Sequence, residues 1–258
     1  MTPELQTALA DKLLALADDE LILAHRHSEW AGHGPILEED IAFANLSLDE
    51  MGHATLWYEA YQELTGTEPD RLAFFRGPAD FRNVQMVELP NGDWAFSMLR
   101  QYLFDTAEMV QLTALVVSSY QPIAAAAAKI RLEELYHLRH TSQWVKRLGL
   151  GTEESNGRMQ RALDELWPYA QQLFVPLPAE SLLVEAGIVG VSRSASETTA
   201  DLYQQWLPTV RDHLTNAGLI IPDNDQPPTR SRAEHTPHLS RLLAEMQMVA
   251  RLDPEAAW

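Results

Sequence analysis

Apolar residues recur at helical spacing over most of the first 150 residues. This spacing predicts one helix over residues 5–30 and a second from residue 36 to about 64. Glycine and proline at 32–35 predict the break between them, because glycine favours a helix C-cap and proline the first turn of the next helix. The expected core positions are Leu5, Leu13, Leu16, Leu23 and Trp30, then Ile41, Phe43, Leu46, Leu48, Leu56 and Trp57.

The same pattern predicts a second pair of long helices. One runs from the N-cap Asp93 to about Tyr120, and the next covers residues 123–148, helped by the alanine run 124–128. Residues 66–93 lack a clear period and are expected to form a crossover with one short helix. Two long helical hairpins joined by a crossover are typical of the ferritin-like four-helix bundle.

Further helices are expected at 153–173, 180–185, 195–217 and 237–252, with Pro168 bending or ending the first of them. Residues 220–232 are polar, contain prolines, and are expected to be extended. No stretch shows the alternation of a strand. The sequence therefore predicts an all-α protein with a single domain over 1–258. Its core bundle would cover about 4–149, and a C-terminal helical extension about 152–258.

Composition excludes several functional classes. The absence of cysteine excludes disulfides, thiolate zinc sites, cysteine-ligated iron–sulfur clusters and a cysteine nucleophile. Acidic residues outnumber Lys and Arg by 37 to 19, and the formal charge of −18 argues against nucleic-acid binding. No apolar run is long enough to cross a membrane, and the first residues lack the layout of a signal peptide. A cytoplasmic protein is expected.

Two E-x-x-H motifs carry the candidate chemistry: Glu50 with His53, and Glu134 with His137. Residues three apart share a helix face, so each motif directs a carboxylate and an imidazole to the same point. Ferritin-like di-iron and di-manganese proteins use one such pair on each of two helices and a further carboxylate from each of the other two. The spacing alone is a weak indication, but each motif falls midway along the second helix of a predicted hairpin.

The bundle also predicts where the two further carboxylates should lie. Folding the first hairpin at its turn brings Glu20 level with Glu50, with Asp18 and Asp19 beside it. Folding the second brings Glu108 level with Glu134, with Asp105 one turn earlier. The expected metal ligands are Glu20, Glu50, His53, Glu108, Glu134 and His137, with Asp19 and Asp105 as alternates for Glu20 and Glu108. The metal would be two ions of iron or manganese, bridged by Glu50 and Glu134.

Each of these residues can also be explained by a structural role without a metal. E-x-x-H pairs also occur on solvated helix faces, although burying several carboxylates without a metal is costly. His25, His27 and His33 are expected to cap a helix or face solvent, and His235 and His238 to mark the start of a helix. Core or interface positions are expected for the aromatic residues Tyr102 and Tyr136 and for the tryptophans at 30, 57, 94, 144, 167 and 206.

Several stretches resemble the C-subunit family of bacterial phenylacetyl-CoA 1,2-epoxidases, the PaaC family. They are residues 29–35, 40–42, 44–46, 89–94, 100–105, 136–139, 242–247 and 254–258, in the same order along nearly the whole chain. The resemblance implies a ferritin-like subunit of a multicomponent monooxygenase in phenylacetate degradation. It implies three kinds of partner: a reductase, a small B subunit, and the catalytic A subunit. Phenylacetyl-CoA would be the substrate of the complex.

In the family, the C subunit is regarded as structural, with a degraded metal site. This chain departs from that pattern, because Glu50, His53, Glu20 and Glu108 are all present. Three interpretations follow: a C-type subunit that keeps a metal site, a scaffold that keeps the residues as a polar network, or a stand-alone di-metal oxidase. A protein of the first two kinds should expose an apolar surface for its partner, and the isolated chain could form a homodimer.

Overall fold

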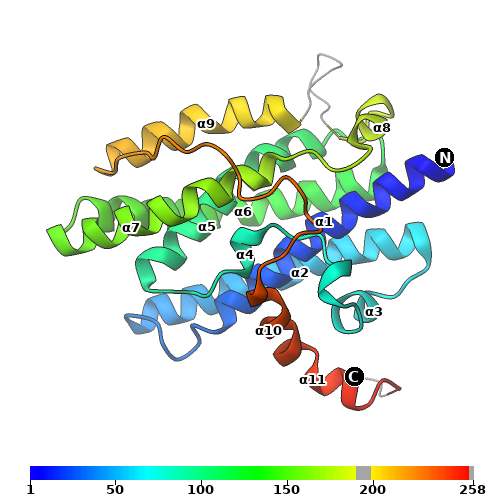
Figure 1. Ribbon diagram of the computed structural model, residues 1–258, viewed down its shortest axis with the longest axis horizontal. Coiled ribbons are helices and arrows are strands. Elements are labelled where there is room, and N and C mark those ends of the chain that lie inside the picture. Colours follow the sequence, from blue (N-terminus) through cyan, green and yellow to red (C-terminus); the bar gives the residue numbers. More distant parts are fainter. Residues whose placement is uncertain (190–198, 256–258) are drawn as a thin grey trace. The chain divides into compact units, whose positions relative to one another are not determined.

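The computed structural model describes residues 1–189 and 199–255, and over these ranges its regular elements are all helices (Figure 1). The chain divides into two compact units, Met1–Pro90 with residues from Ser231 onward, and Asn91–Arg230. The all-α class and the two long hairpins are confirmed. The single-domain organisation stays a prediction. None of the described helices combines the length and the apolar character needed to cross a membrane.

The first unit is built on the hairpin of α1 (Pro3–Ser28) and α2 (Leu37–Thr65), which lie side by side. The side chain of Thr2 caps α1 by accepting a hydrogen bond from the backbone N–H of Leu5. In the connection, the Asp40 carboxylate accepts bonds from the backbone N–H groups of Gly32 and Gly34, at 2.8 and 3.1 Å. These bonds tie the turn to the first residues of α2 and so set how the two helices meet.

The crossover is more structured than the single short helix that the sequence analysis expects. It contains α3 (Pro69–Phe74), the 3-10 helix η1 (Pro78–Asp80) and α4 (Gln85–Glu88). The last part of the chain returns to this unit as α10 (Pro237–Met246) and α11 (Met248–Leu252), where one helix over 237–252 was expected. Residues far apart in sequence therefore complete the same unit.

The second unit contains the hairpin of α5 (Trp94–Leu115) and α6 (Gln121–Gly149). It continues through α7 (Glu153–Ala170), η2 (Gln171–Phe174), α8 (Glu180–Glu185) and α9 (Thr199–Asn216), and α7 and α9 pack against α5 and α6. Pro168 lies inside α7, and the α-helical turn gives way to a 3-10 turn only after Ala170. The part of the expected helix at residues 195–198 lies outside the described residues.

Two of the expected core positions on α2 are wrong. Ile41 and Leu48 are 54% and 70% exposed, whereas Phe43 and Trp57 on the same helix are fully buried. Leu5, Trp30 and Leu56 are only partly buried. Apolar residues occur on more than one face of α2, so periodicity alone does not identify its buried side.

Candidate metal sites on the two helix hairpins

A buried cluster of two carboxylates and one imidazole lies in the first hairpin. Glu20 comes from α1, and Glu50 and His53 come from one turn of α2. His53 Nδ1 lies 3.3 Å from Glu50 Oε2 and 3.9 Å from Glu20 Oε2. The three residues offer ligand atoms that all lie within 4.8 Å of one another, and each residue is at most 1% exposed. The structure thus brings together the three residues that the sequence analysis selects on this hairpin.

The register of the two helices explains why these residues meet. Ser47 Oγ donates a 2.8 Å hydrogen bond to the backbone carbonyl of Ala24, across the hairpin. Ser47 stands one turn before Glu50, and Ala24 one turn after Glu20, so this bond fixes the two carboxylates at the same level. An antiparallel pair with this register places Glu20 opposite the E-x-x-H turn.

The two aspartates next to Glu20 have other partners. Asp18 accepts bonds from the Tyr58 hydroxyl at 2.5 Å, from the guanidinium of Arg76, and from the backbone N–H of Arg82 at 2.8 Å. Burial raises the pKa of Tyr58 well above its usual value, and the Asp18 carboxylate raises it further. Tyr58 therefore remains a hydrogen-bond donor to this carboxylate.

Asp19 accepts a 2.7 Å bond from the backbone N–H of Val84 and a 2.8 Å bond from Arg232. Burial raises the pKa of Asp19, although the Arg232 guanidinium and the two bonds oppose that shift. Asp18 and Asp19 thus hold α1 against the crossover and the returning C-terminal segment. Of the three consecutive acids, Glu20 is the one that reaches Glu50 and His53.

The second hairpin holds the other E-x-x-H motif. Glu134 Oε1 lies 2.6 Å from His137 Nδ1 on α6, and both residues are buried. Glu108 on α5 is also buried, at 6% exposed. Among the described residues, however, Glu108 is not part of a group of three ligand atoms within 4.8 Å. Its role as a ligand stays a prediction, as does a joint centre of six ligands.

Asp105, the alternate for Glu108, is engaged in the packing of this hairpin. Its two oxygens accept 2.6 Å bonds from the Gln101 amide and from the Thr141 hydroxyl, and Thr141 belongs to α6. Burial raises the pKa of Tyr102, and the nearby Asp105 carboxylate adds to that effect. Asp105 therefore joins α5 to α6 through Thr141.

The residues of these sites match the ligand preferences of iron and manganese. Carboxylate oxygens suit hard cations, and imidazole suits iron. Burying a carboxylate away from water costs free energy unless it gains a compensating charge or hydrogen bonds. In the first hairpin, Glu20 and Glu50 are nearly inaccessible and face an imidazole, which is neutral when it binds a metal. A bound cation would add positive charge beside these two carboxylates.

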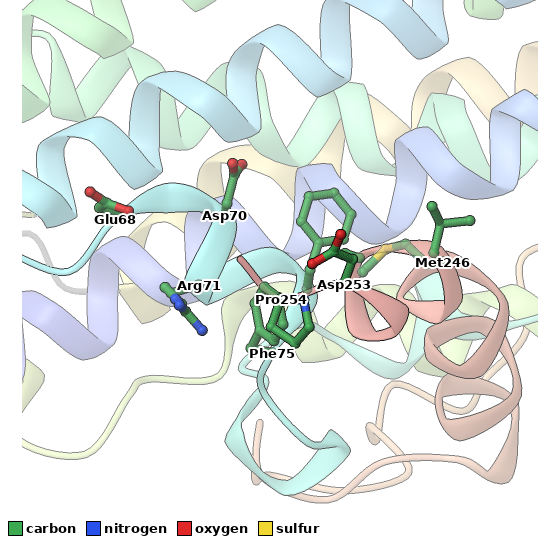
Figure 2. Close-up of a pocket in the computed structure, with 10 residues that line it drawn as sticks. Glu68, Asp70, Arg71, Phe75, Met246, Asp253 and Pro254 are labelled. Atoms are coloured by element: carbon green, nitrogen blue, oxygen red, sulfur yellow. The ribbon is translucent and has the colours of Figure 1, made fainter. Parts of the chain in front are cut away.

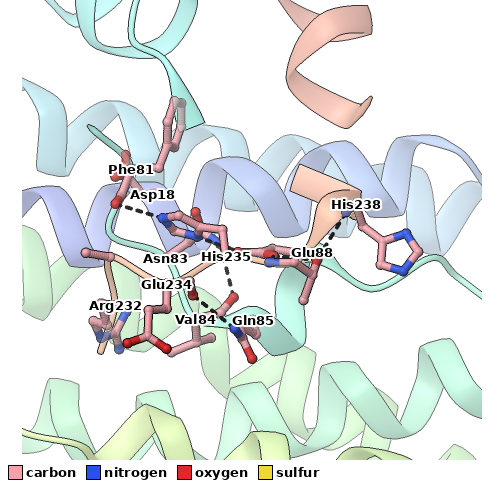
Figure 3. A network of polar contacts seen from close by, with 12 residues as sticks. Asp18, Phe81, Asn83, Val84, Gln85, Glu88, Arg232, Glu234, His235 and His238 are labelled. Atoms are coloured by element: carbon pink, nitrogen blue, oxygen red, sulfur yellow. Dashed lines mark hydrogen bonds and ion pairs between the residues drawn. The ribbon is translucent and has the colours of Figure 1, made fainter. Parts of the chain in front are cut away.

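A second buried network, around Glu88, was not anticipated by the sequence analysis (Figure 3). The Glu88 carboxylate lies 2.6 Å from His235 Nδ1, accepts bonds from the Thr236 N–H and hydroxyl at 2.7 and 2.6 Å, and accepts a 3.0 Å bond from Asn83. The other ring nitrogen of His235 contacts the Phe81 carbonyl. His235 lies just before α10 and Thr236 is the N-cap of that helix, so the expected helix start is confirmed; their partner Glu88 lies 147 positions before His235. The only indication of this network in the sequence is that Glu88 is an acidic residue within an otherwise apolar stretch, residues 86–89.

Other expected residues have mixed outcomes. His27 is fully buried and its ring lies 4.5 Å from that of Phe43, so the expectation that it faces solvent is wrong. Among the aromatic residues, Trp57, Trp167 and Trp206 belong to the core. Tyr136 is 74% exposed, which leaves an interface as its expected role.

Comparison with known proteins extends these observations. The sequence model of one family, described as phenylacetic acid catabolic protein, matches residues 1–258. The C subunit of the 1,2-phenylacetyl-CoA epoxidase of Escherichia coli K12 is 37% identical over 247 residues, which cover 95% of this chain and 97% of that protein. The A subunit of the same enzyme is 26% identical over 211 residues, covering 78% of this chain and 67% of that protein.

Proposed function

Because the chain belongs to the family of phenylacetic acid catabolic proteins, we propose that it is the C-type subunit of a phenylacetyl-CoA epoxidase that acts in phenylacetate degradation in the cytoplasm. The observation that carries this proposal is the 37% identity over 95% of this chain and 97% of the E. coli C subunit. Because the match covers nearly the whole of both proteins, nearly every part of the E. coli C subunit has a counterpart in this chain.

The partner proposed for this chain is a catalytic A-type subunit, with a reductase and a small B subunit in the same complex. An exposed apolar stripe on α6 supports a helical partner. Its large residues are Leu132, Leu135 and Tyr136, which are 61%, 47% and 74% exposed, and Ala125 and Ala128 extend it toward the start of the helix. These positions share one face of α6, so the stripe is continuous.

The stripe gives a direct test of the pairing. The full chain with Leu135→Glu should lose most of its co-purification with a tagged A-type subunit, because the new charge would be buried in the interface. The matched control is Val117→Glu, which introduces the same charge at a residue that is 57% exposed and outside the stripe. Equal binding of Leu135→Glu and wild type would show that this face does not bind the A-type subunit.

A second candidate function is a di-metal oxidase activity of the chain itself, and the buried cluster of Glu20, Glu50 and His53 favours it. In this proposal these residues hold metal on the first hairpin. Glu108, Glu134 and His137 hold metal on the second hairpin. Two bound iron or manganese ions would supply the activation of O₂. The chain would contribute buried ligands of fixed orientation and a site closed to water.

Elemental analysis tests the oxidase candidate. The chain is expressed without partners and supplied with iron and manganese, and metal per chain is measured after desalting. The oxidase candidate requires about two ions per chain. Glu50→Gln and Glu134→Gln should each lower this number, and the exposed Glu59→Gln on α2 should not. If the chain contains no metal and still binds the A-type subunit, the oxidase candidate is excluded and the chain acts as a scaffold for that subunit.

A further inference from the structure

A pocket in the first unit lies between the crossover and the last described residues of the chain, and none of its lining residues is a metal-ligand candidate (Figure 2). It has a volume of about 320 Å³ and opens between α3 and α11. Its apolar lining consists of Phe74, Phe75, Met246, Val249, Ala250 and Pro254. A pocket of this size is at the lower end of those that bind small ligands, and it suits a single large side chain.

Polar bonds, not apolar packing, hold the wall of this pocket in place. None of the α11 residues is buried. Instead, Gln247 donates to the carbonyls of Ala73 and Arg76, at 3.0 and 3.1 Å. Arg251 donates to the carbonyls of Phe74 and Arg76, at 3.1 and 2.9 Å. These bonds satisfy carbonyls in and just after the last turn of α3, and they fix α11 beside it.

Among the described residues, no side chain covers the large apolar side chains of α11. Met248, Val249 and Leu252 are 59%, 53% and 80% exposed, and Val249 lines the pocket. A short helix that presents three large apolar side chains to solvent, next to an apolar pocket, is typical of an interaction surface.

The charges around the pocket indicate the nature of its ligand. Three exposed carboxylates, those of Glu68, Asp70 and Asp253, lie on its lining. The lining has one cation, Arg71, and its guanidinium lies 4.7 Å from the centre of the Phe75 ring. Figure 2 draws the labelled carboxylates and Phe75 among the residues that line the pocket. The rim is therefore acidic around an apolar floor, and it complements positive charge.

We propose that this pocket binds an apolar side chain of a partner polypeptide in which lysine or arginine flanks that side chain. The apolar residue would fill the floor, where a buried anchor contributes most of the binding energy. The flanking cations would pair with Asp70, Glu68 and Asp253 at the rim. A second copy of this chain is a poor occupant, because its formal charge of −18 would repel the acidic rim. The proposal is independent of metal binding and of the stripe on α6.

The test uses the full chain and a short synthetic peptide with a central phenylalanine between pairs of lysines. A matched peptide carries alanine at the centre. Methionine methyl groups of the protein are ¹³C-labelled, and the Met246 signal is assigned with Met246→Leu. The phenylalanine peptide should shift the Met246 signal and leave that of the buried Met86 unchanged, because Met86 does not line the pocket. The alanine peptide should leave both unchanged.

Affinities of the phenylalanine peptide for protein variants then distinguish binding at the pocket from attraction to the general acidity of the chain. Asp253→Lys should weaken binding by about tenfold or more. Glu59→Lys changes the net charge equally on the exposed side of α2, and should weaken binding by less than about twofold. Ala250→Trp, which fills the pocket, should abolish binding; if this variant does not fold, Asp253→Lys decides. Equal binding of the two peptides, equal effects of the two lysine variants, or no Met246 shift at millimolar peptide would each overturn the proposal.

Discussion

Asp19 and Arg232 form a buried ion pair across 213 positions of the sequence, with 2.8 Å between Oδ2 and Nη1. Each side chain is 8% exposed. The next residue on α1, Glu20, lies instead within 3.9 Å of His53. Two adjacent carboxylates thus have separate roles, since Asp19 fixes the helix to the C-terminal segment and Glu20 faces the E-x-x-H motif.

The first prediction concerns this ion pair. Arg232→Met should lower the free energy of unfolding by about 3–5 kcal/mol, because it leaves the Asp19 carboxylate buried without its cation. Urea unfolding followed by circular dichroism measures the effect. Arg241→Met, at an exposed position of α10, is the control and should change stability little. A loss for Arg232→Met as small as that of the control would mean that the pair is not needed for stability.

The second prediction separates the roles of Asp19 and Glu20. Glu20→Gln should lower the metal content of the folded chain without large loss of stability, because it removes a candidate ligand and a buried charge. Asp19→Asn should lower stability, because it leaves Arg232 without its carboxylate, and should keep the metal content per folded chain. Both are measured by elemental analysis and by urea unfolding. The opposite pattern would assign the ligand role to Asp19.

The third prediction concerns two helix glycines. A Cβ at Gly149 would lie 2.2 Å from the Ala217 carbonyl oxygen, so Gly149→Ala should destabilise the protein by about 1–3 kcal/mol. Gly52, between Glu50 and His53, has open space around it. Gly52→Ala should therefore stabilise by about 0.5–1 kcal/mol through helix propensity. Thermal unfolding of the two variants should move in opposite directions, and a shift of both in the same direction would refute the argument.

The fourth prediction concerns pH. Burial lowers the pKa of His213 below its usual value of 6.5, and Lys146 adds to this, while the bond to the Ser142 carbonyl opposes it. As pH falls below about 6.5, the unfolded chain therefore binds a proton here before the folded chain does, and stability decreases until the folded-state pKa is passed. His213→Phe keeps a ring against Tyr102 and removes the titrating group.

The stability of His213→Phe should therefore fall less than that of wild type between pH 7 and pH 5. Urea unfolding at several pH values gives the two curves. Parallel curves would contradict a contribution from His213.

The sequence was most informative where structure is local. The long helices and the meeting of each E-x-x-H pair follow from the 3.6-residue period, because residues three apart share a face in any helix. The crossover helices were not predictable in this way. The segment between η1 and α4 is held by bonds from the N–H groups of Arg82 and Val84 to Asp18 and Asp19, more than 60 positions earlier. No pattern within residues 66–93 reports such partners.

The wrong burial predictions for residues on the long helices also arise because contacts with other parts of the chain decide burial. Ile41 and Leu48 share α2 with the buried Phe43, and periodicity does not say which apolar face a neighbour covers. His27 is buried because Phe43 of the neighbouring helix packs on it. The network of Glu88 and His235 could not be derived for the same reason, because its two residues meet only in the folded chain.

The long sequence separation of the Asp19–Arg232 pair has a consequence for synthesis on the ribosome. The first hairpin is complete once residue 65 has emerged, but the guanidinium that neutralises Asp19 is added 213 residues after that aspartate. At about 5–20 residues per second, the 167 residues from the end of the hairpin to Arg232 take about 8–33 s. During that interval the nascent hairpin carries an uncompensated aspartate at a position that is buried in the finished protein, so a chaperone has time to hold it before the first unit closes.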